Sequence, residues 1–313
     1  MTADGRASPT AVLTRLQSWQ QVVAAAEAGP AGSSRCVLLQ AALQTAADSG
    51  GLACFLLDAG YLKMFLRAKA YDVKKAEQCA LNYWAFRKRV GWADDTNPAS
   101  RSVCARAVES ELRSGFNLLL DGVDVNGYVL LTQRMALLQT ASASTIESQQ
   151  RAGYYLLHRA LSRPAASLQG LAMVLDFRGF RWSTFARVGT SDVQRGVAML
   201  QDCFPAKLEV IYVLHPPGWL QAVVALLRPF LRSDSLKQKF VLCANTAALH
   251  AHIPPHVLPA AGGEWGGTAH LDWDGQVNEW IGEESRAGAG RFEPATLLTS
   301  AGGGGGQVGG SLW

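Results

Sequence analysis

The chain has 313 residues, of which 49% are hydrophobic and 17% are charged, and its formal net charge is +4. This composition is too apolar for a globally disordered chain, and the length suits one large domain or two smaller ones. The charge falls far short of the basic footprint of a nucleic-acid-binding protein, although it favours contact with an anionic lipid surface.

Compartment is predicted from three features of the sequence. Residues 1–10 lack the apolar core of a secretory signal peptide, and no run of about eighteen apolar residues predicts a membrane span. The six cysteines are scattered without Cys-x-x-Cys pairs, which is typical of reduced thiols in a cytosolic protein. We therefore expect a cytoplasmic protein.

The first third of the chain is predicted to be helical. Four segments show the spacing of amphipathic helices, and Asp72 is placed to cap the last of them. Beyond a weakly patterned connector, two short apolar runs separated by a Gly- and Asp-containing turn predict a pair of strands, and a further helix follows. These helices are expected at 11–28, 35–48, 52–69, 72–90 and 145–162, and the two strands at 116–120 and 128–131.

The second half predicts an α/β layer. Apolar runs at 171–175, 208–214 and 240–243 suit strands that are buried on both faces of a mostly parallel sheet. Ser191 and Gln194 form a capping-box pattern that predicts a helix start between the first two of these strands. Residues 270–284 predict a strand end and a short helix, and the Gly-rich tail from residue 285 predicts disorder.

A helix predicted between the last two strands is apolar around nearly its whole circumference. Such a helix is either sandwiched in the interior, which is the commoner arrangement, or it alternates between the protein and a lipid. Its apolar residues include Trp219, Leu220, Val223, Val224, Leu227, Phe230 and Leu231.

Catalytic patterns are weak. The sequence has no Gly-x-x-x-x-Gly-Lys-Ser/Thr, no Gly-x-Ser-x-Gly and no His-Glu-x-x-His motif. His250, His252 and His256 lie around a Pro-Pro step and have no spacing set by a helix or hairpin, so we expect no metal site. Asp176 at a strand end fits a turn and capping role. We predict a non-enzymatic protein without a cofactor.

Several motifs resemble the CRAL-TRIO lipid-binding family. In the second half these are DFRGF at 176–180, FPAKL at 204–208, IYVLHPPGW at 211–219, LRPFL at 227–231 and KFVL at 239–242, followed by IPPHVLP and WGGT at 253–259 and 265–268. Upstream, YLKMFLRAKAYDVKKA at 61–76 is similar to the helical signature LLRFLRARKFDVEKA that precedes the domain in this family.

The resemblance implies a mixed, mostly parallel sheet flanked by helices, with an apolar gate helix, behind an all-α N-terminal bundle. We expect an N-terminal helical segment at 1–95, CRAL-TRIO-N-like from about residue 52, then a lipid-binding domain at 96–284 and a disordered tail at 285–313. The implied function is binding and transfer or sensing of a lipid at membranes, where the protein docks transiently and peripherally.

Site residues follow from the expected sheet and gate. Met173, Leu175, Phe185, Ile211 and Val213 are candidates for the floor of an apolar cavity, although each is equally well a packing residue. The residues of the apolar helix named above form the expected gate. Contacts with a head group or a membrane are assigned to Arg228, Arg232, Lys237 and Lys239.

The expected ligand is an apolar lipid. Family members that exchange phosphatidylinositol use a lysine, a glutamate and a lysine at positions that are Ala70, Ala206 and Lys239 here. An alanine side chain cannot bind a phosphate or an inositol hydroxyl group, which argues against phosphatidylinositol. A sterol, tocopherol-like, retinoid or other isoprenoid lipid, or phosphatidylcholine, fits better.

A second function stays open. The run Val213-Leu214-His215-Pro216 is also similar to the adaptor branch of this superfamily, in which (I/V)-V-H-P replaces N-x-P. That branch implies a regulatory module that binds a protein partner such as a small GTPase or a phosphatase. The helical signature at 65–76 favours the lipid branch.

Overall fold

The computed structural model of the protein describes residues 30–52, 54–57, 59–92, 103–138, 143–199, 204–220, 239–260 and 265–287. The expected helix at 11–28, the gate helix beyond Leu220 and residues 288–313 of the expected tail lie outside these residues. The tail was predicted to begin at residue 285, but residues 285–287 are instead the end of a helix. No helix of the described segments is long and apolar enough to cross a membrane.

The N-terminal segment is helical, as predicted. It contains α2 (Pro30–Asp48), the 3₁₀ helix η1 (Cys54–Leu57), α3 (Ala59–Ala68) and α4 (Val73–Val90), so the single helix predicted at 52–69 is two pieces. The Asp72 side chain caps α4 by accepting a hydrogen bond from the Lys75 backbone N–H at 3.1 Å. Gly91 ends α4 in a left-handed conformation, with φ at 74°.

A five-stranded mixed sheet forms the centre of the molecule. Its order follows the sequence, β1-β2-β3-β4-β5, with β1 antiparallel to β2 and every other neighbouring pair parallel. This confirms the predicted mixed, mostly parallel sheet. The strands are β1 (Asn117–Val123), β2 (Val129–Arg134), β3 (Leu171–Asp176), β4 (Leu208–Leu214) and β5 (Phe240–Cys243).

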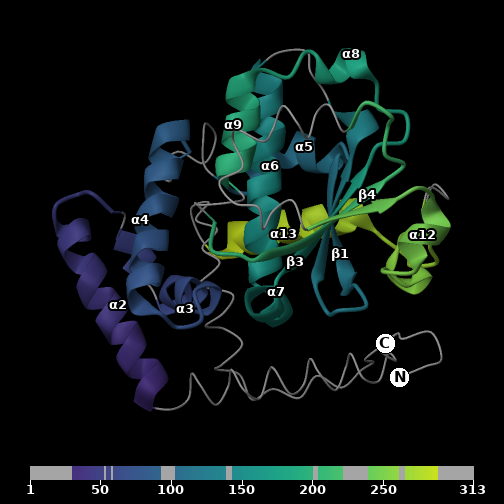
Figure 1. Cartoon of the computed structure of the whole chain (residues 1–313). Coiled ribbons are helices and arrows are strands. Elements are labelled where there is room, and N and C mark those ends of the chain that lie inside the picture. Colours follow the sequence, from purple (N-terminus) through teal and green to yellow (C-terminus); the bar gives the residue numbers. More distant parts are fainter. Residues whose placement is uncertain are drawn as a thin grey trace.

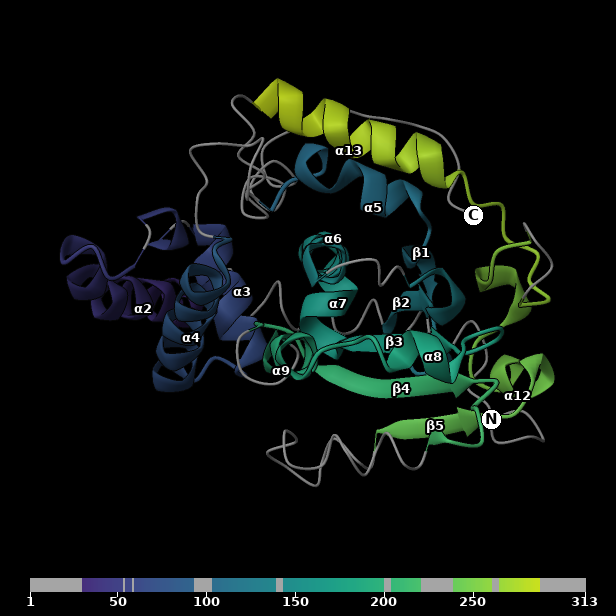
Figure 2. The same ribbon diagram turned by 90° about the horizontal axis from the view of Figure 1, so that it is seen from above.

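Helices flank the sheet on both sides (Figure 1). The N-terminal helices lie on one side of the sheet and α12 lies on the other, in both views (Figures 1 and 2). The connecting elements are η2 (Arg106–Val108), α5 (Glu109–Arg113), η3 (Met135–Leu137), α6 (Ala143–Leu161), α7 (Pro164–Gln169), α8 (Trp182–Phe185), α9 (Thr190–Ala198), α12 (Thr246–His250), η6 (Pro255–Val257) and α13 (Trp273–Ala287).

The start of α9 differs from the prediction. The helix begins at Thr190, and Gly189 rather than Ser191 is its N-cap. The carboxylate of Asp192, three residues on, accepts a hydrogen bond from the Gly189 backbone N–H at 3.2 Å and also pairs with Arg195. A carboxylate at this position satisfies an otherwise unpaired N–H group and complements the helix dipole, so it outcompetes the Ser191 and Gln194 pattern.

The two faces of the sheet belong to two hydrophobic clusters. Side chains alternate along a strand, so Leu171 and Met173 of β3 point to one face while Ala172 and Val174 point to the other. The first face packs against α6, and its cluster continues into α2, α3 and α4. We call it the α6 face. The predicted boundary near residue 95 stays a prediction, although this core runs through both segments.

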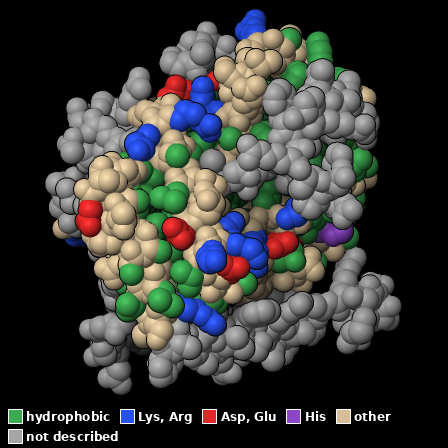
Figure 3. Space-filling view, turned by 60° about the vertical axis from the view of Figure 1, so that its left-hand side comes forward, with side chains coloured by type: hydrophobic (Ala, Val, Ile, Leu, Met, Phe, Trp, Pro, Cys, Tyr) green, Lys and Arg blue, Asp and Glu red, His purple; other side chains and the backbone are tan. Residues whose placement is uncertain are grey.

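The side of the molecule that carries α2 and α4 is polar and mixed in charge. Lys and Arg side chains gather there in small groups, one of them together with Asp and Glu, among scattered apolar side chains (Figure 3).

Helix α13 is fixed to α6 by a buried ionic network. Arg159 of α6 is 3% exposed, and its guanidinium lies 2.7 Å from the Glu283 carboxylate and 3.4 Å from that of Glu284. The Tyr155 hydroxyl donates to Glu284 at 2.8 Å, and the Ala105 backbone N–H donates to its second oxygen at 2.8 Å. Because burial raises the pKa of Glu284, these partners are needed to keep its carboxylate charged.

Candidate functional site

The structure brings four of the five predicted cavity residues together. Met173 of β3 is opposite Ile211 of β4, and Leu175 is opposite Val213, in a parallel register. All four belong to the α6 face, and they form two neighbouring rungs across the strands. Strand alternation and a register that is continuous from Ala172 to Asp176 therefore place an apolar patch where the sequence predicted a cavity floor.

Two small cavities lie between the α6 face and α6. The first has a volume of about 20 Å³ and the second about 10 Å³, and they share Leu131, Leu157 and Met173 in their walls. About 10–15 Å³ is enough for one water molecule, whereas pockets for small molecules are typically 300–1,000 Å³. A lipid can therefore enter only where these walls part. The first cavity is also lined by Asn117, Thr132, Gln133, Gly153, Leu156 and Met199, and the second by Leu171, Phe204, Ala206 and Leu208.

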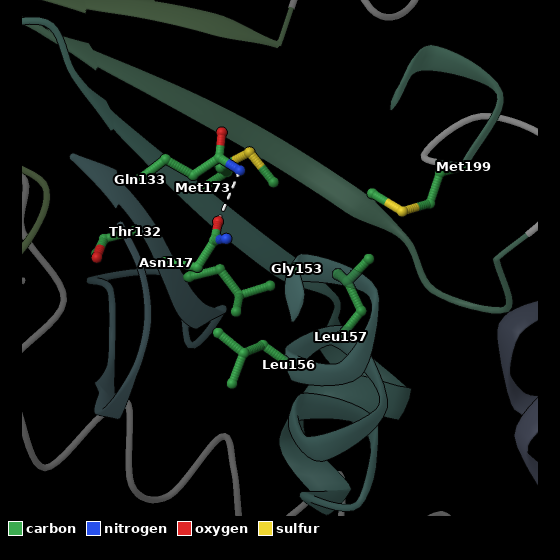
Figure 4. A pocket seen from close by; sticks show the side chains of 9 residues that line it. Asn117, Thr132, Gln133, Gly153, Leu156, Leu157, Met173 and Met199 are labelled. Atoms are coloured by element: carbon green, nitrogen blue, oxygen red, sulfur yellow. Dashed lines mark hydrogen bonds between the residues drawn. The ribbon is translucent and has the colours of Figure 1, made fainter. Parts of the chain in front are cut away.

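One end of the first cavity is polar (Figure 4). The Gln133 side chain donates from Nε2 to Oδ1 of Asn117 at 2.9 Å, and the Asn117 side chain donates from Nδ2 to the Gln149 carbonyl at 3.2 Å. Asn117 is 4% exposed. The sequence analysis missed this pair. Asn117 lies in the first predicted strand, but Gln133 lies two residues beyond the second, which was predicted to end at residue 131. In the structure β2 continues to Arg134, and the antiparallel register places Gln133 opposite Asn117.

Phe185 lies away from this patch, in an aromatic cluster beyond the carboxyl ends of β3 and β4. Its ring centroid is 5.3 Å from that of Trp182 and 5.9 Å from that of Trp219. Phe177 and Phe180 complete the cluster, at 6.3 and 5.8 Å from Trp219. Trp182 is 47% exposed although it is a large apolar residue, so this aromatic cluster reaches the surface.

Only the first two residues of the predicted gate are described. Trp219 belongs to the aromatic cluster, and Leu220 is 9% exposed. The other gate residues and three of the predicted head-group contacts lie outside the described residues: Val223, Val224, Leu227, Arg228, Phe230, Leu231, Arg232 and Lys237.

Lys239, Ala206 and Ala70 occupy the positions that hold the inositol phosphate in the resembling family members. The Lys239 ammonium group donates to the Leu208 carbonyl and lies 3.9 Å from the Glu209 carboxylate, at the start of β4. Ala206 lines the second cavity with its methyl group. Ala70 lies in an exposed turn after α3, with φ at 51°. Of these three residues only Ala206 lines one of the two cavities, and its side chain cannot bind phosphate.

The three histidines considered for a metal site are dispersed. His250 bonds through Nε2 to the Trp265 carbonyl at 2.8 Å, and His252 stacks on Tyr212 with ring centroids 5.1 Å apart. Within the described ranges, no three His, Cys, Asp or Glu side chains lie close enough together to hold a metal ion.

Residues 113–267 match the family model described as CRAL/TRIO domain. This part of the chain belongs to the CRAL/TRIO family. The matched residues contain all five strands, both cavities and the aromatic cluster, so the resemblance seen in the sequence is confirmed together with the fold.

Individual relatives are distant. The chain is 27% identical over 213 residues to the human protein "Alpha-tocopherol transfer protein-like", an alignment that covers 68% of this chain and 59% of that protein. It is 25% identical over 210 residues to human clavesin-2, covering 67% and 62% of the two chains. The chain thus spans less than two thirds of the length of either CRAL/TRIO relative.

A solved structure supports the same fold. The crystal structure of Sfh5 aligns with a TM-score of 0.54 at 14% sequence identity, covering 82% of this chain and 96% of that one. At this level of identity the alignment supports the fold alone.

Proposed function

We propose that the protein is a non-enzymatic lipid carrier or sensor that binds its ligand between the α6 face and α6. The observation that carries this proposal is the pair of apolar rungs, Met173–Ile211 and Leu175–Val213, with cavities already open beside Met173. A relative named for tocopherol transfer supports the same assignment.

Burial of apolar surface stabilises a bound lipid relative to the same lipid in water. Burying a methylene group is worth about 0.8 kcal/mol, so one long acyl or isoprenoid chain gains on the order of 10 kcal/mol. A bilayer offers the same burial, so extraction is nearly balanced and the barrier is set by opening of the site. Met173 and Met199 face the first cavity, and unbranched thioether side chains adapt readily to a new occupant.

The aromatic cluster is the proposed membrane-docking surface. Trp182 is 47% exposed, and Arg181 and Arg187 are exposed on either side of α8. Indole rings bind at the boundary between head groups and acyl chains, while arginine is attracted to anionic lipids by about 1 kcal/mol per charge. Docking through this surface places the protein peripherally at a cytoplasmic membrane, with Trp219, the first residue of the predicted gate, at the contact.

Lipid loading tests the proposal directly. We expect native mass spectrometry of the protein purified from cells to show a bound lipid, or the protein to load from liposomes. Ala206→Phe fills the second cavity and is expected to reduce loading severalfold, whereas Ala59→Phe, at the exposed start of α3, leaves loading unchanged. A folded protein that stays empty under all conditions contradicts the carrier and favours the alternative, an adaptor that binds a protein partner.

A further inference from the structure

We infer that Gln133, positioned by Asn117, is the head-group contact of the first cavity and selects an uncharged lipid whose head carries a hydroxyl group. This inference rests on the proposed lipid-binding function. It assigns the polar end of the ligand to the sheet, next to β1 and β2, and the apolar tail to the second cavity.

The hydrogen-bond network fixes the orientation of both amides. The Gln149 carbonyl only accepts, so Asn117 must present Nδ2 to it and Oδ1 to Gln133. Gln133 must then present Nε2 to Asn117. Within the described part of the chain this is the hydrogen bond that Gln133 makes, so its Oε1 atom is available to accept from a ligand hydroxyl group.

The register of the strands places the Gln133 acceptor beside the predicted floor of the cavity. Asn117 is opposite Gln133, Gln133 is opposite Leu175, and Leu175 is opposite Val213, so the four residues form one rung. The next rung, through Met173 and Ile211, is apolar. A ligand that lies across the two rungs therefore meets one polar end and one apolar end.

Charge excludes a phosphorylated head at this end. Among the described residues that line the two cavities, none is Lys, Arg, His, Asp or Glu. An anionic head would be buried there without a counter-ion, which is strongly unfavourable, whereas a hydroxyl group needs one acceptor. The cavity of about 20 Å³ also admits a group of the size of one water molecule without moving its walls.

The apolar tail of the ligand is expected to extend from the first cavity into the second. The second cavity shares Leu131, Leu157 and Met173 with the first and leads to Ala206. Rotation of the Leu157 and Met173 side chains joins the two cavities into one channel along the sheet, with Gln133 at one end and Ala206 at the other.

A competition between three matched lipids tests the inference. The protein is incubated with phosphatidylcholine vesicles that contain equal amounts of hexadecan-1-ol, 1-methoxyhexadecane and hexadecyl phosphate, and bound lipids are quantified by native mass spectrometry. We expect the alcohol to load about tenfold more than the ether, as for one hydrogen bond to a buried acceptor, and the phosphate to load least. In Gln133→Leu, the preference for the alcohol over the ether disappears while the ether still loads.

A second variant tests the placement of the head group by filling part of the cavity, without removing a hydrogen bond. A Cβ atom at Gly153 would lie 3.7 Å from the Asn117 amide, an ordinary contact, so Gly153→Ala is compatible with the fold and fills the polar end of the cavity. We expect it to lower loading of the alcohol about tenfold. Gly196→Ala is the matched control, because Gly196 is also helical and its Cβ atom would meet the Gln150 side chain at 3.4 Å, away from the cavities.

The outcomes separate this inference from the proposed function. Equal loading of alcohol and ether, preferential loading of hexadecyl phosphate or phosphatidylcholine, or an unchanged alcohol preference in Gln133→Leu overturns the inference while leaving lipid binding intact. Unchanged alcohol loading in Gly153→Ala overturns the placement of the head group. If none of the lipids loads into the folded protein, the proposed function fails, and the inference fails with it.

Discussion

The hydroxyl group of Tyr83, on α4, lies 2.7 Å from Nε2 of His158, on α6. His158 Nδ1 lies 2.9 Å from the Tyr154 carbonyl, which only accepts, so Nδ1 carries the proton and Nε2 accepts from Tyr83. Both side chains are almost completely buried, and they join an N-terminal helix to the helix that covers the sheet. Arg67 of α3 adds a longer contact of 3.4 Å to Ser167 of α7.

Removing the Tyr83 hydroxyl group should destabilise the protein. In Tyr83→Phe the Nε2 atom of His158 loses its donor in a dry interior, which costs about 1–3 kcal/mol in the free energy of unfolding, measured by urea titration. The double variant Tyr83→Phe/His158→Leu removes both partners, so it should cost less than the sum of the single variants. Additive costs would contradict the coupling between the two residues.

Acidification should weaken the fold through His158. Burial, and then the charge of Arg87, lower the pKa of His158 to about 3, below the value of about 6.5 in an unfolded chain. The unfolded state therefore binds a proton that the folded state rejects, and stability falls as the pH drops through the window from 6.5 towards 3. The loss between pH 7 and pH 5 is about 2 kcal/mol.

The control for this effect is His158→Gln, which removes the titrating group. Burial raises the pKa values of Asp124 and Glu284, so these carboxyl groups favour the folded state on acidification and act with the opposite sign. They are present in both proteins, so the difference between the two pH titrations reports on His158. Identical pH dependence in the two proteins would show that His158 is not buried in its neutral form.

The ionic network on α13 should be worth more than an exposed ion pair. Arg159→Met leaves the Glu284 carboxylate, which is 4% exposed, without its cation, and we expect a loss of about 3 kcal/mol in unfolding free energy. Arg113→Met is the matched control, because Arg113 also bridges to α13 but its partner Asp274 is 73% exposed. That change should cost less than about 1 kcal/mol. Equal losses in thermal or urea unfolding would contradict the difference in burial.

Membrane docking should depend on Trp182. Trp182→Ala removes the most exposed ring of the aromatic cluster, so it should weaken binding to anionic vesicles about tenfold in a sedimentation assay, with little change in thermal stability. Leu38→Ala provides the comparison, because Leu38 is 58% exposed on α2, outside the cluster. An equal effect of both substitutions would indicate general hydrophobic adsorption instead of a docking surface.

The sequence predicted what depends on local pattern. Apolar runs located the strands, and Asp72 located the start of α4. Of the five residues predicted for the cavity floor, the structure places four on one face: Met173, Leu175, Ile211 and Val213. Family motifs then supplied the order of the elements. The predicted start of α9 was wrong by two residues, because Gly189 rather than Ser191 is the N-cap and Asp192 supplies the capping carboxylate.

Contacts between distant residues could not be predicted in this way. Asn117 meets Gln133 only because of the hairpin register, and Arg159 meets Glu284 across 125 positions of sequence. The prediction that Phe185 lies in the cavity floor was wrong, because Phe185, in α8, contacts Trp219 instead. Hydrophobic periodicity in the sequence does not predict that contact. Such pairs require the tertiary arrangement, since hydrophobic periodicity specifies which side of an element is buried but not what lies opposite.

Five consecutive residues of α6 contact three different parts of the protein: α13, the first cavity and α4. Tyr155 and Arg159 hold α13, Leu156 and Leu157 line the first cavity, and His158 holds α4. A wall that yields to an incoming ligand must therefore strain the attachments of both ends of the described chain. Binding of a ligand in the cavities should therefore change the amide hydrogen-exchange rates of α4 and α13, although both helices lie far from the sheet.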